Sequence, residues 1–349
     1  MTDEHRPTGE EVAAIDCGTN SIRLLIARPA PDGTGLVQLH REMRVVRLGE
    51  GVDAAGEFSE AALQRTFDAL DDYAVVIRRL LGTDTLSPER VRFVATSASR
   101  DVSNRDAFAA GVRARLGVDP DVVDGLEEAG LSFAGAAGAL PVELRQRLGR
   151  GHDTVRVLVV DLGGGSTEFV LGTLSLTELG RSDVLAAVSK DMGCVRFTER
   201  HLHSDPPSVA EIDAAQHDID TVLDEVAAHL DLSSVDAVVG VAGTVTTVTA
   251  AALGLYTYDP DALHGAVVDL PTIDAAAGTL LTSTRDQRAA LPFMHPGRVD
   301  VIGAGSLIWT RILHRMQQVT EGRIGVAVAS EHDILDGAAL SLLGSAHDR

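Results

Sequence analysis

The sequence is poor in the residues that build disulfide frameworks and aromatic cores. Its 349 residues include two cysteines, Cys17 and Cys194, which lie far apart and form no CxxC pair. This spacing excludes a disulfide scaffold, and we expect two small core thiols in a reducing cytosol. Aromatic residues make up only 3% of the chain, so the core must consist of Val, Leu, Ile and Ala.

Lysine is almost absent, because Lys190 is the only one and arginine supplies nearly all the positive charge. The formal net charge is −21, so the surface as a whole repels nucleic acid and DNA or RNA is excluded as a primary partner. A polyanionic substrate needs a local positive pocket in this acidic field. Arginine suits such a pocket because its planar group binds phosphate through two hydrogen bonds.

Signals for export and membrane insertion are also missing. The first residues, MTDEHRPTGEE, are polar and acidic, which excludes a secretory signal peptide. The uncharged stretch 237–255 is as long as a membrane span, but it contains three glycines and several threonines and has no basic flanks. A buried strand, a Gly/Thr turn and a helix fit it better, so we expect a cytoplasmic protein without membrane contact.

The pattern of apolar residues predicts an α/β protein, and the length is sufficient for two domains with separate cores. We expect strands at 12–15, 22–27, 91–95, 122–123, 155–160, 168–171, 237–241 and 324–329. Four serines are predicted to cap the first turns of helices: Ser59, Ser103, Ser208 and Ser330. The last three are each followed, three residues later, by an acidic residue that supports the cap, namely Asp106, Glu211 and Asp333. A further helix begins near Glu127, and the polar segment 141–154 is predicted to be a loop.

An internal repeat is the most informative feature. A strand, an aspartate, a glycine-rich turn and a returning strand occur at 15–26 and again at 159–171. This pattern predicts two related α/β domains whose turns face one cleft. By analogy with other α/β folds, a ligand binds beyond the carboxyl ends of the strands.

The second of these turns has the composition of a phosphate and metal site. Gly163, Gly164 and Gly165 allow the backbone to approach an anion with its N–H groups turned inward. Ser166 and Thr167 add hydroxyl donors, and the flanking carboxylates of Asp161 and Glu168 could reach a divalent cation. A strand rather than a helix follows the turn, so it is not a Rossmann motif.

Two other loops are candidates for phosphate contacts. The first repeat has Gly18, Thr19, Asn20 and Ser21 after Asp16, and an ordinary hairpin explains this segment equally well. Residues 240–244 form a third glycine loop, in which Gly243 and Thr244 are the candidate contacts. Each loop is a stronger candidate for a phosphate site because the other two occur in the same chain.

Together the three loops resemble the phosphate-1, phosphate-2 and adenosine motifs of the actin, sugar kinase and heat-shock ATPase superfamily. Further segments resemble the exopolyphosphatase and guanosine pentaphosphate phosphatase (Ppx/GppA) family: 14–21, 96–104 (TSASRDVSN), 124–129 (DGLEEA), 192–196, 296–302 and 330–332. The resemblance extends from about residue 12 to residue 342. It implies two actin-like (ASKHA, RNase H-like) domains with a cleft between them, 1–127 completed by 328–349, and 128–327.

The resemblance also implies roles for single residues. Glu128 takes the position of the catalytic base, while Glu127 points to another helix face because neighbours on a helix are about 100° apart. Asp161 and Glu168 would hold Mg²⁺, with Mn²⁺ as an alternative. The phosphates would be bound by the three loops and by Arg23, Arg100, Arg298 and Lys190. The histidines have no metal-site spacing and are interpreted as structural or surface groups.

Two departures from the family pattern affect the expected substrate. Asp124 replaces the usual serine before the glycine, which adds negative charge near a site for polyanions. Long family members carry further helical domains after this core, so we expect shorter polyphosphate chains as substrates here. The resemblance also suggests a homodimer.

The resulting hypothesis is hydrolysis of the terminal phosphate of inorganic polyphosphate. Three alternatives remain at this point: a phosphatase for the 5′-phosphate of guanosine pentaphosphate, an ATP-dependent kinase or ATPase of the superfamily, and a sensor that binds polyphosphate or the alarmone without catalysis. The sequence does not separate the first alternative from polyphosphate hydrolysis, because the core residues are shared.

Overall fold

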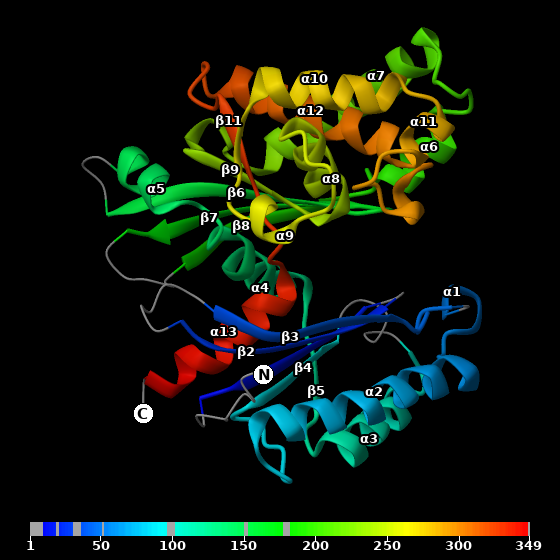
Figure 1. Ribbon diagram of the computed structural model, residues 1–349, viewed down its shortest axis with the longest axis vertical. Helices are drawn as coiled ribbons and strands as arrows, with labels where there is room; N and C mark the ends of the chain where they lie inside the picture. Colours follow the sequence, from blue (N-terminus) through cyan, green and yellow to red (C-terminus); the bar gives the residue numbers. More distant parts are fainter. Residues whose placement is uncertain are drawn as a thin grey trace. The chain divides into compact units, whose positions relative to one another are not determined.

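The chain divides into two compact units in the computed structural model (Figure 1). The structure describes residues 10–18, 21–30, 36–50, 52–95, 102–149, 153–176 and 182–347. Unit 1 comprises Met1–Gly135 and Ile334–Arg349, and unit 2 comprises Ala136–Asp333. Each unit contains one mixed β-sheet with helices packed against it, so each has a core of its own.

The sheet of unit 1 has five strands in the order β3-β2-β1-β4-β5. Their bounds are β1 Val12–Cys17, β2 Ser21–Pro29, β3 Leu36–Val45, β4 Val91–Ala95 and β5 Pro120–Val122. The predicted hairpin is confirmed, because β1 pairs with β2 antiparallel, and β4 adds in parallel on the other side of β1. The edge strand β3, which pairs with β2, was not predicted.

Helices cover both faces of this sheet. Their bounds are α1 Val52–Ala55, α2 Glu60–Leu81, α3 Arg105–Leu116, α4 Gly125–Ala137 and α13 Ile334–His347. Alternation along β1 sends Ala13 and Ile15 into the core beneath α2 and α3, and Val12 and Ala14 into the core beneath α13. The last helix thus closes the second face of the unit.

The helix caps of unit 1 test the local predictions. Ser59 caps α2, since its Oγ accepts from the N–H of Ala62 at 3.2 Å, and Gly82 ends the helix with a φ of 66°. The expected cap of α3 at Ser103 is wrong, because the N-cap is Asn104. The amide of Asn104 instead exchanges two hydrogen bonds with the backbone of Phe58, at 3.0 and 2.8 Å. A contact distant in sequence has displaced the local cap.

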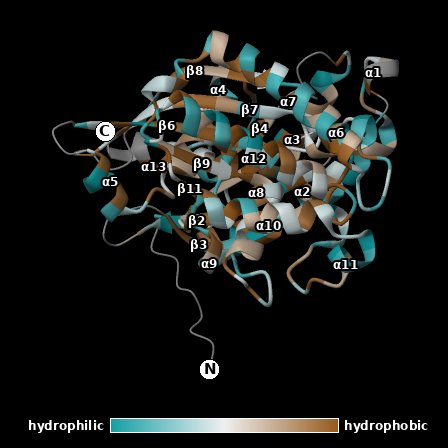
Figure 2. Ribbon diagram, turned by 90° about the horizontal axis from the view of Figure 1, so that it is seen from above, coloured by the Kyte–Doolittle hydropathy of each residue, from teal (hydrophilic) through white to brown (hydrophobic). Residues whose placement is uncertain are grey.

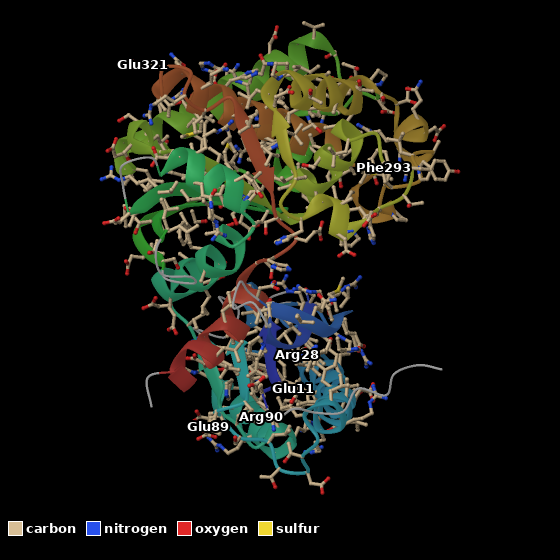
Figure 3. The ribbon with its side chains drawn as sticks, turned by 60° about the vertical axis from the view of Figure 1, so that its left-hand side comes forward. Glu11, Arg28, Glu89, Arg90, Phe293 and Glu321 are labelled. Carbon is tan, nitrogen blue, oxygen red and sulfur yellow. The ribbon has the colours of Figure 1, made fainter. Side chains whose placement is uncertain are left out.

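A partly buried ion pair joins the starts of β1 and β4 (Figure 3). The carboxylate of Glu11, which is fully buried, accepts from Nη2 of Arg90 at 3.3 Å. Nε of Arg90 also donates to the backbone carbonyl of Glu11 at 2.9 Å, and Nη2 donates to the carbonyl of Leu81 at the end of α2. One guanidinium group therefore connects two strands and a helix.

The sheet of unit 2 has six strands in the order β10-β11-β9-β6-β7-β8. Their bounds are β6 Thr154–Leu162, β7 Thr167–Ser175, β8 Ser182–Lys190, β9 Ala237–Val241, β10 Val267–Asp269 and β11 Val326–Ala329. The run β8-β7-β6-β9 repeats the pairing of β3-β2-β1-β4. The predicted internal repeat is therefore confirmed at the level of strand pairing.

The helices of unit 2 form a thick layer on its sheet (Figure 1). Their bounds are α5 Val142–Leu148, α6 Cys194–His201, α7 Val209–His229, α8 Ala242–Ala252, α9 Pro260–Leu263, α10 Leu270–Thr282, α11 Arg285–Ala289 and α12 Ile302–Val319. Helix α12 lies at the centre, packs against α6, α7, α8 and α10, and buries Trp309. Strands β6 and β9 carry mainly hydrophobic residues, shown in brown in Figure 2, as expected for a core of aliphatic side chains.

Some local predictions in unit 2 succeed and others fail. The Ser208–Glu211 capping box of α7 is confirmed. The predicted loop at 141–154 is wrong, because α5 forms within it. The last helix begins at Ile334 and not directly after its predicted cap Ser330, since the hydroxyl of Ser330 is used in a tight turn with the backbone of His332.

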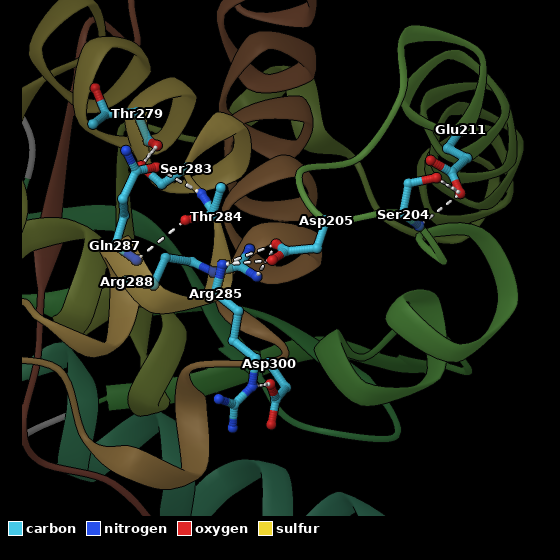
Figure 4. A network of polar contacts seen from close by, with 10 residues as sticks. All are labelled: Ser204, Asp205, Glu211, Thr279, Ser283, Thr284, Arg285, Gln287, Arg288 and Asp300. Atoms are coloured by element: carbon cyan, nitrogen blue, oxygen red, sulfur yellow. Dashed lines mark hydrogen bonds and ion pairs between the residues drawn. The ribbon is translucent and has the colours of Figure 1, made fainter.

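A polar network fixes the loop before α7 to α11 (Figure 4). The carboxylate of Asp205 accepts from the backbone N–H of Arg285 at 2.9 Å and from Nη2 of Arg288 at 3.3 Å. The Arg288 side chain is only 7% exposed, whereas Arg285 pairs with Asp300 on the surface. A buried guanidinium group therefore depends on one carboxylate of a neighbouring loop.

Candidate active site

Three polar side chains form a row across the sheet of unit 2. Asp161 on β6 is directly opposite Glu168 on β7, and Glu168 is directly opposite Ser189 on β8. Directly opposed residues share a face of the sheet, so the three side chains lie side by side. On the other side of β6, Asp161 is paired with Val241, the last residue of β9. The row therefore lies at the ends of strands β6 and β9, where the second and third glycine loops begin.

The Gly163–Gly165 turn is held through its carbonyl groups. The carbonyl of Gly163 accepts from the N–H of Cys194, and that of Gly164 accepts from the N–H groups of Val195 and Arg196, at 2.9 to 3.2 Å. Nε of Arg196 donates to the carbonyl of Gly165 at 2.8 Å. Among the described residues, no hydrogen bond uses the N–H of Gly164 or Gly165. The turn thus directs its carbonyls to α6 and leaves donors suited to an anion.

Gly193 allows this close approach between the turn and α6. A Cβ atom at this position would lie 2.2 Å from the carbonyl oxygen of Gly164. The φ and ψ of Gly193 are −117° and 162°, which any residue can adopt. The glycine is therefore required by space and not by backbone conformation.

The carboxylates of Asp161 and Glu168 are partly buried and suit a hard cation. Oε1 of Glu168 accepts from the hydroxyl groups of Ser166 and Ser189, each at 2.7 Å. No group of three or more His, Cys, Asp or Glu side chains suited to a metal occurs in the part of the chain that the structure describes. Mg²⁺ is commonly held by one or two carboxylates together with phosphate oxygens and water, and Mn²⁺ accepts the same ligands. The pair fits such an ion.

Arg298 lies against the third loop. A Cβ atom on Gly243 would lie 2.4 Å from Nε of Arg298, so the guanidinium group packs directly on the backbone of the loop. Nη1 of Arg298 donates to the hydroxyl of Thr247 at 3.0 Å, and its Cζ lies 5.7 Å from the ring centre of Tyr258. Thr244 follows in α8 and is buried. The structure thus brings Gly243 and Arg298 together, as the sequence analysis grouped them.

The first loop belongs to unit 1. The N–H of Gly18 donates to the carbonyl of Ser21 at 3.0 Å, which closes the turn between β1 and β2. Thr19 and Asn20 lie outside the described residues. Arg23 is directly opposite Asp16, and its Nε and Nη2 donate to Oδ2 of Asp16 at 2.8 and 2.6 Å. The predicted phosphate ligand is thus fixed in position by a carboxylate that is almost fully buried.

Glu128 lies in the first turn of α4 and is partly buried. Its neighbour Glu127 is exposed and binds Nη2 of Arg92 at 2.7 Å. Oδ1 of Asp124 accepts from the N–H of Glu127 at 2.9 Å, so Asp124 caps the helix as a serine would. The unusual aspartate therefore keeps the local structure of the segment.

The remaining predicted ligands are placed differently. Arg100 lies outside the described residues. Lys190 is paired with Thr167 in the register and thus faces away from Glu168. Its Nζ forms an ion pair with Glu225 of α7 at 2.8 Å. The structure does not bring Lys190 to the row of Asp161, Glu168 and Ser189.

A buried thiol and a partly buried phenol near the loops have raised pKa values. Burial raises the pKa of the Cys194 thiol, which keeps it protonated at neutral pH and suits it to a core position rather than to nucleophilic attack. Burial, and then the hydrogen bond with Glu331, raise the pKa of Tyr258. The Tyr258 hydroxyl lies 2.5 Å from Oε1 of Glu331 and 2.8 Å from Oγ1 of Thr246. The Tyr258 hydroxyl is therefore a neutral group that links Glu331 and Thr246.

The sequence analysis gave no site role to three residues of these sites: Asp16 and Arg196, which it named only within motifs, and Ser189. Asp16 and Arg23 are equally distant from the centre of the hairpin turn, and counting the register would have paired them. Ser189 and Arg196 act across contacts between β7 and β8 and between α6 and the turn, for which the sequence carries no local signal. None of the described helices has the length and apolar content needed to cross a membrane.

Known proteins resemble this chain over almost its whole length. The model of the Ppx/GppA phosphatase family matches residues 25–342. Exopolyphosphatase 2 of Mycobacterium tuberculosis is 45% identical over 343 residues, covering 95% of this chain and 98% of that protein. A guanosine-5′-triphosphate,3′-diphosphate pyrophosphatase of Photobacterium profundum is 32% identical over 243 residues, covering 69% of this chain but only 44% of that protein.

A solved structure agrees with the fold. The crystal structure of the Aquifex aeolicus member of the Ppx/GppA family superposes with a TM-score of 0.75 at 26% identity, and the match covers 97% of this chain and 98% of that chain. The predicted α/β fold of two actin-like domains is thereby confirmed. With its sheets, its loops and the family match in agreement, the chain belongs to the Ppx/GppA phosphatase family.

Proposed function

We propose that this protein is an exopolyphosphatase that hydrolyses the terminal phosphoanhydride bond of inorganic polyphosphate. The supporting observation is the 45% identity with Exopolyphosphatase 2 of Mycobacterium tuberculosis, which extends over 98% of that protein. The relative named as a guanosine pentaphosphate hydrolase is matched over less than half of its length. Polyphosphate is therefore the preferred substrate in this proposal.

The reaction requires a positioned water molecule and neutralisation of the phosphate charge. Water attacks the terminal phosphorus, the bridging P–O bond breaks, and orthophosphate and a chain shorter by one unit leave. The carboxylate of Glu128 accepts the proton of the attacking water. The N–H groups of Gly164 and Gly165 and the guanidinium group of Arg23 bind phosphate oxygens.

A divalent cation completes the proposed site. Asp161 and Glu168 would hold Mg²⁺ or Mn²⁺, which supplies positive charge to the phosphate oxygens when bound.

The hydroxyl groups of Ser166 and Thr167, the predicted phosphate donors of the turn, both have hydrogen-bond partners within unit 2. The hydroxyl of Ser166 is bound to Glu168, and that of Thr167 donates to the carbonyl of Met192. A homodimer, a cytoplasmic location and a preference for short chains stay predictions.

The test is phosphate release from short and long polyphosphate and from guanosine pentaphosphate, with wild type and Glu128→Gln. Loss of a general base lowers kcat by about 10²- to 10⁴-fold, and substrate affinity should change little because the two side chains have similar shape. Glu127→Gln is the matched control, since Glu127 is a neighbouring exposed glutamate that binds Arg92. It should retain wild-type kcat.

Each other outcome selects a different function. Faster release from guanosine pentaphosphate than from polyphosphate would favour the alarmone phosphatase. Tight polyphosphate binding without phosphate release would indicate a sensor, and turnover of ATP alone would indicate an ATPase. An active Glu128→Gln enzyme would refute Glu128 as the base.

A further inference from the structure

The edge strand β8 contributes a side chain to the candidate metal site. Ser189 is the cross-strand partner of Glu168, and its hydroxyl donates to Oε1 of Glu168 at 2.7 Å. The hydroxyl of Ser166, which comes from the glycine turn, donates to the same oxygen at the same distance. Two independent segments of unit 2 thus hold one atom of one carboxylate.

This arrangement makes the two oxygens of Glu168 unequal. A carboxylate has about four lone-pair sites, two on each oxygen. The two serine hydroxyls account for both sites on Oε1, so this oxygen has little capacity left for a cation. Oε2 is then the oxygen that can bind metal, and Glu168 is restricted to binding through one oxygen.

Binding through one oxygen matters for the choice of ion. Mg²⁺ requires nearly ideal octahedral geometry, and two oxygens of one carboxylate are too close together to occupy two octahedral positions without distortion. Ca²⁺ accepts six to eight oxygens in flexible geometry, including carboxylates that bind through both oxygens. A glutamate with one blocked oxygen therefore favours the smaller ion.

We propose that Ser189 is a positioning residue of the metal site, which fixes Glu168 together with Ser166 so that only Oε2 binds the cation, and which thereby favours Mg²⁺ and Mn²⁺ over Ca²⁺. The inference depends on the proposed metal role of Asp161 and Glu168. Ser189 itself does not contact the cation. Its position on an exposed edge strand means that its hydroxyl can be removed without opening the core.

The experiment measures Mn²⁺ affinity without substrate, from the EPR signal of free Mn²⁺, and then the Ca²⁺ concentration that displaces bound Mn²⁺. Partners of metal ligands commonly change affinity by about 10- to 100-fold. Because Ser166 remains, we expect Ser189→Ala to weaken Mn²⁺ binding by about 5- to 10-fold and to let Ca²⁺ compete better. Ser189→Ala with Ser166→Ala should show a larger change of both kinds.

Two control variants distinguish the effect of the Ser189 hydroxyl from a general disturbance of strand β8. Ser189→Thr keeps the hydroxyl and suits a β-strand, so it should restore near wild-type affinity. Ser182→Ala makes the same change at the opposite end of β8, about 23 Å away along the strand. It should bind Mn²⁺ like wild type.

Failure of the inference and failure of the proposed function give different results. If Glu168→Gln weakens Mn²⁺ binding but Ser189→Ala does not, the positioning role is refuted and the metal site stands. Equal losses in Ser189→Ala and Ser189→Thr would also refute it, because the hydroxyl would not be the cause. A wild-type protein that binds no Mn²⁺ would overturn both proposals.

Discussion

Replacement of Gly193 by alanine tests the contact that shapes the phosphate turn. In the structure the new methyl carbon would lie 2.2 Å from the carbonyl oxygen of Gly164, 2.4 Å from its carbonyl carbon and 2.5 Å from that of Gly165. An ordinary contact needs roughly 3.4 Å, so α6 and the turn must separate by about 1 Å. The backbone angles of Gly193 are available to alanine, so the effect is purely steric.

The energetic consequence follows from what the displaced carbonyl binds. The oxygen of Gly164 accepts from the N–H groups of Val195 and Arg196, and a shift of this size strains or breaks both hydrogen bonds. Overpacking typically costs about 1–3 kcal/mol, which corresponds to a decrease in Tm of about 2–4 °C per kcal/mol for a unit of this size. If the turn binds phosphate, a displacement of about 1 Å lowers kcat/KM by about 100-fold.

The assay compares thermal unfolding and phosphate release of Gly193→Ala with those of Gly278→Ala. Gly278 lies in α10 of the same unit, and a methyl group added there would meet no neighbouring atom within 4 Å beyond the backbone of its own helix. Alanine there should leave activity unchanged and raise stability by about 0.5–1 kcal/mol, because alanine favours a helix. A Gly193→Ala protein with wild-type Tm and activity would refute the close packing of α6 on the turn.

Two further predictions concern stability. Asp205→Ala removes the carboxylate that the buried Arg288 binds, and it should lower the free energy of unfolding by about 2 kcal/mol. Urea unfolding measures this change. The control is Asp300→Ala, which breaks an exposed pair with Arg285 and should have little effect. Hydrogen bonds from the backbone and side chain of Ser208 lower the pKa of Glu211 from 4.5 to about 2. Since the folded-state pKa is the lower one, the stabilisation is present above pH 4.5 and is lost as the pH falls towards 2. Thermal unfolding between pH 2 and 7 should show a wild-type advantage over Glu211→Gln only at the higher pH values, and an equal advantage at pH 2 would contradict the shifted pKa.

The sequence predicts those elements whose signals are local. The helices α2 and α7 were found because each has a cap, an apolar stripe or a capping box within its own residues. The hairpin of β1 and β2 was found because its apolar runs flank a glycine turn. The repeat of this hairpin as β6 and β7 then indicated the α/β fold with two related domains.

Other elements were missed because long-range contacts decide them. The edge strands β3 and β8 are only half buried, so their apolar pattern is weak and pairing with β2 and β7 determines their conformation. Asn104 binds the backbone of Phe58, which no cap rule at Ser103 can anticipate. The helix α5 is polar and short, so its sequence looks like a loop.

The residues of the candidate site also fall into two groups, those that local patterns predict and those that long-range contacts place. Asp161 and Glu168 flank one turn, and their opposition across β6 and β7 follows from a simple hairpin count. Ser189 depends on the register of a third strand, and the ion pair of Lys190 with Glu225 depends on the packing of α7. These relations belong to the tertiary structure, so the sequence placed Lys190 among the ligands and omitted Ser189.

The composition of unit 1 from two separate segments has a consequence for synthesis on the ribosome. Helix α13 closes the sheet face formed by Val12, Ala14, Leu25 and Ala27, but it is made only after the roughly 200 residues of unit 2. At a translation rate of about 5–20 residues per second, this face stays without its helix for about 10–40 s. Unit 2 is continuous and can fold during that time. The nascent chain therefore carries an apolar sheet surface on unit 1 that chaperones can bind until the last helix is released.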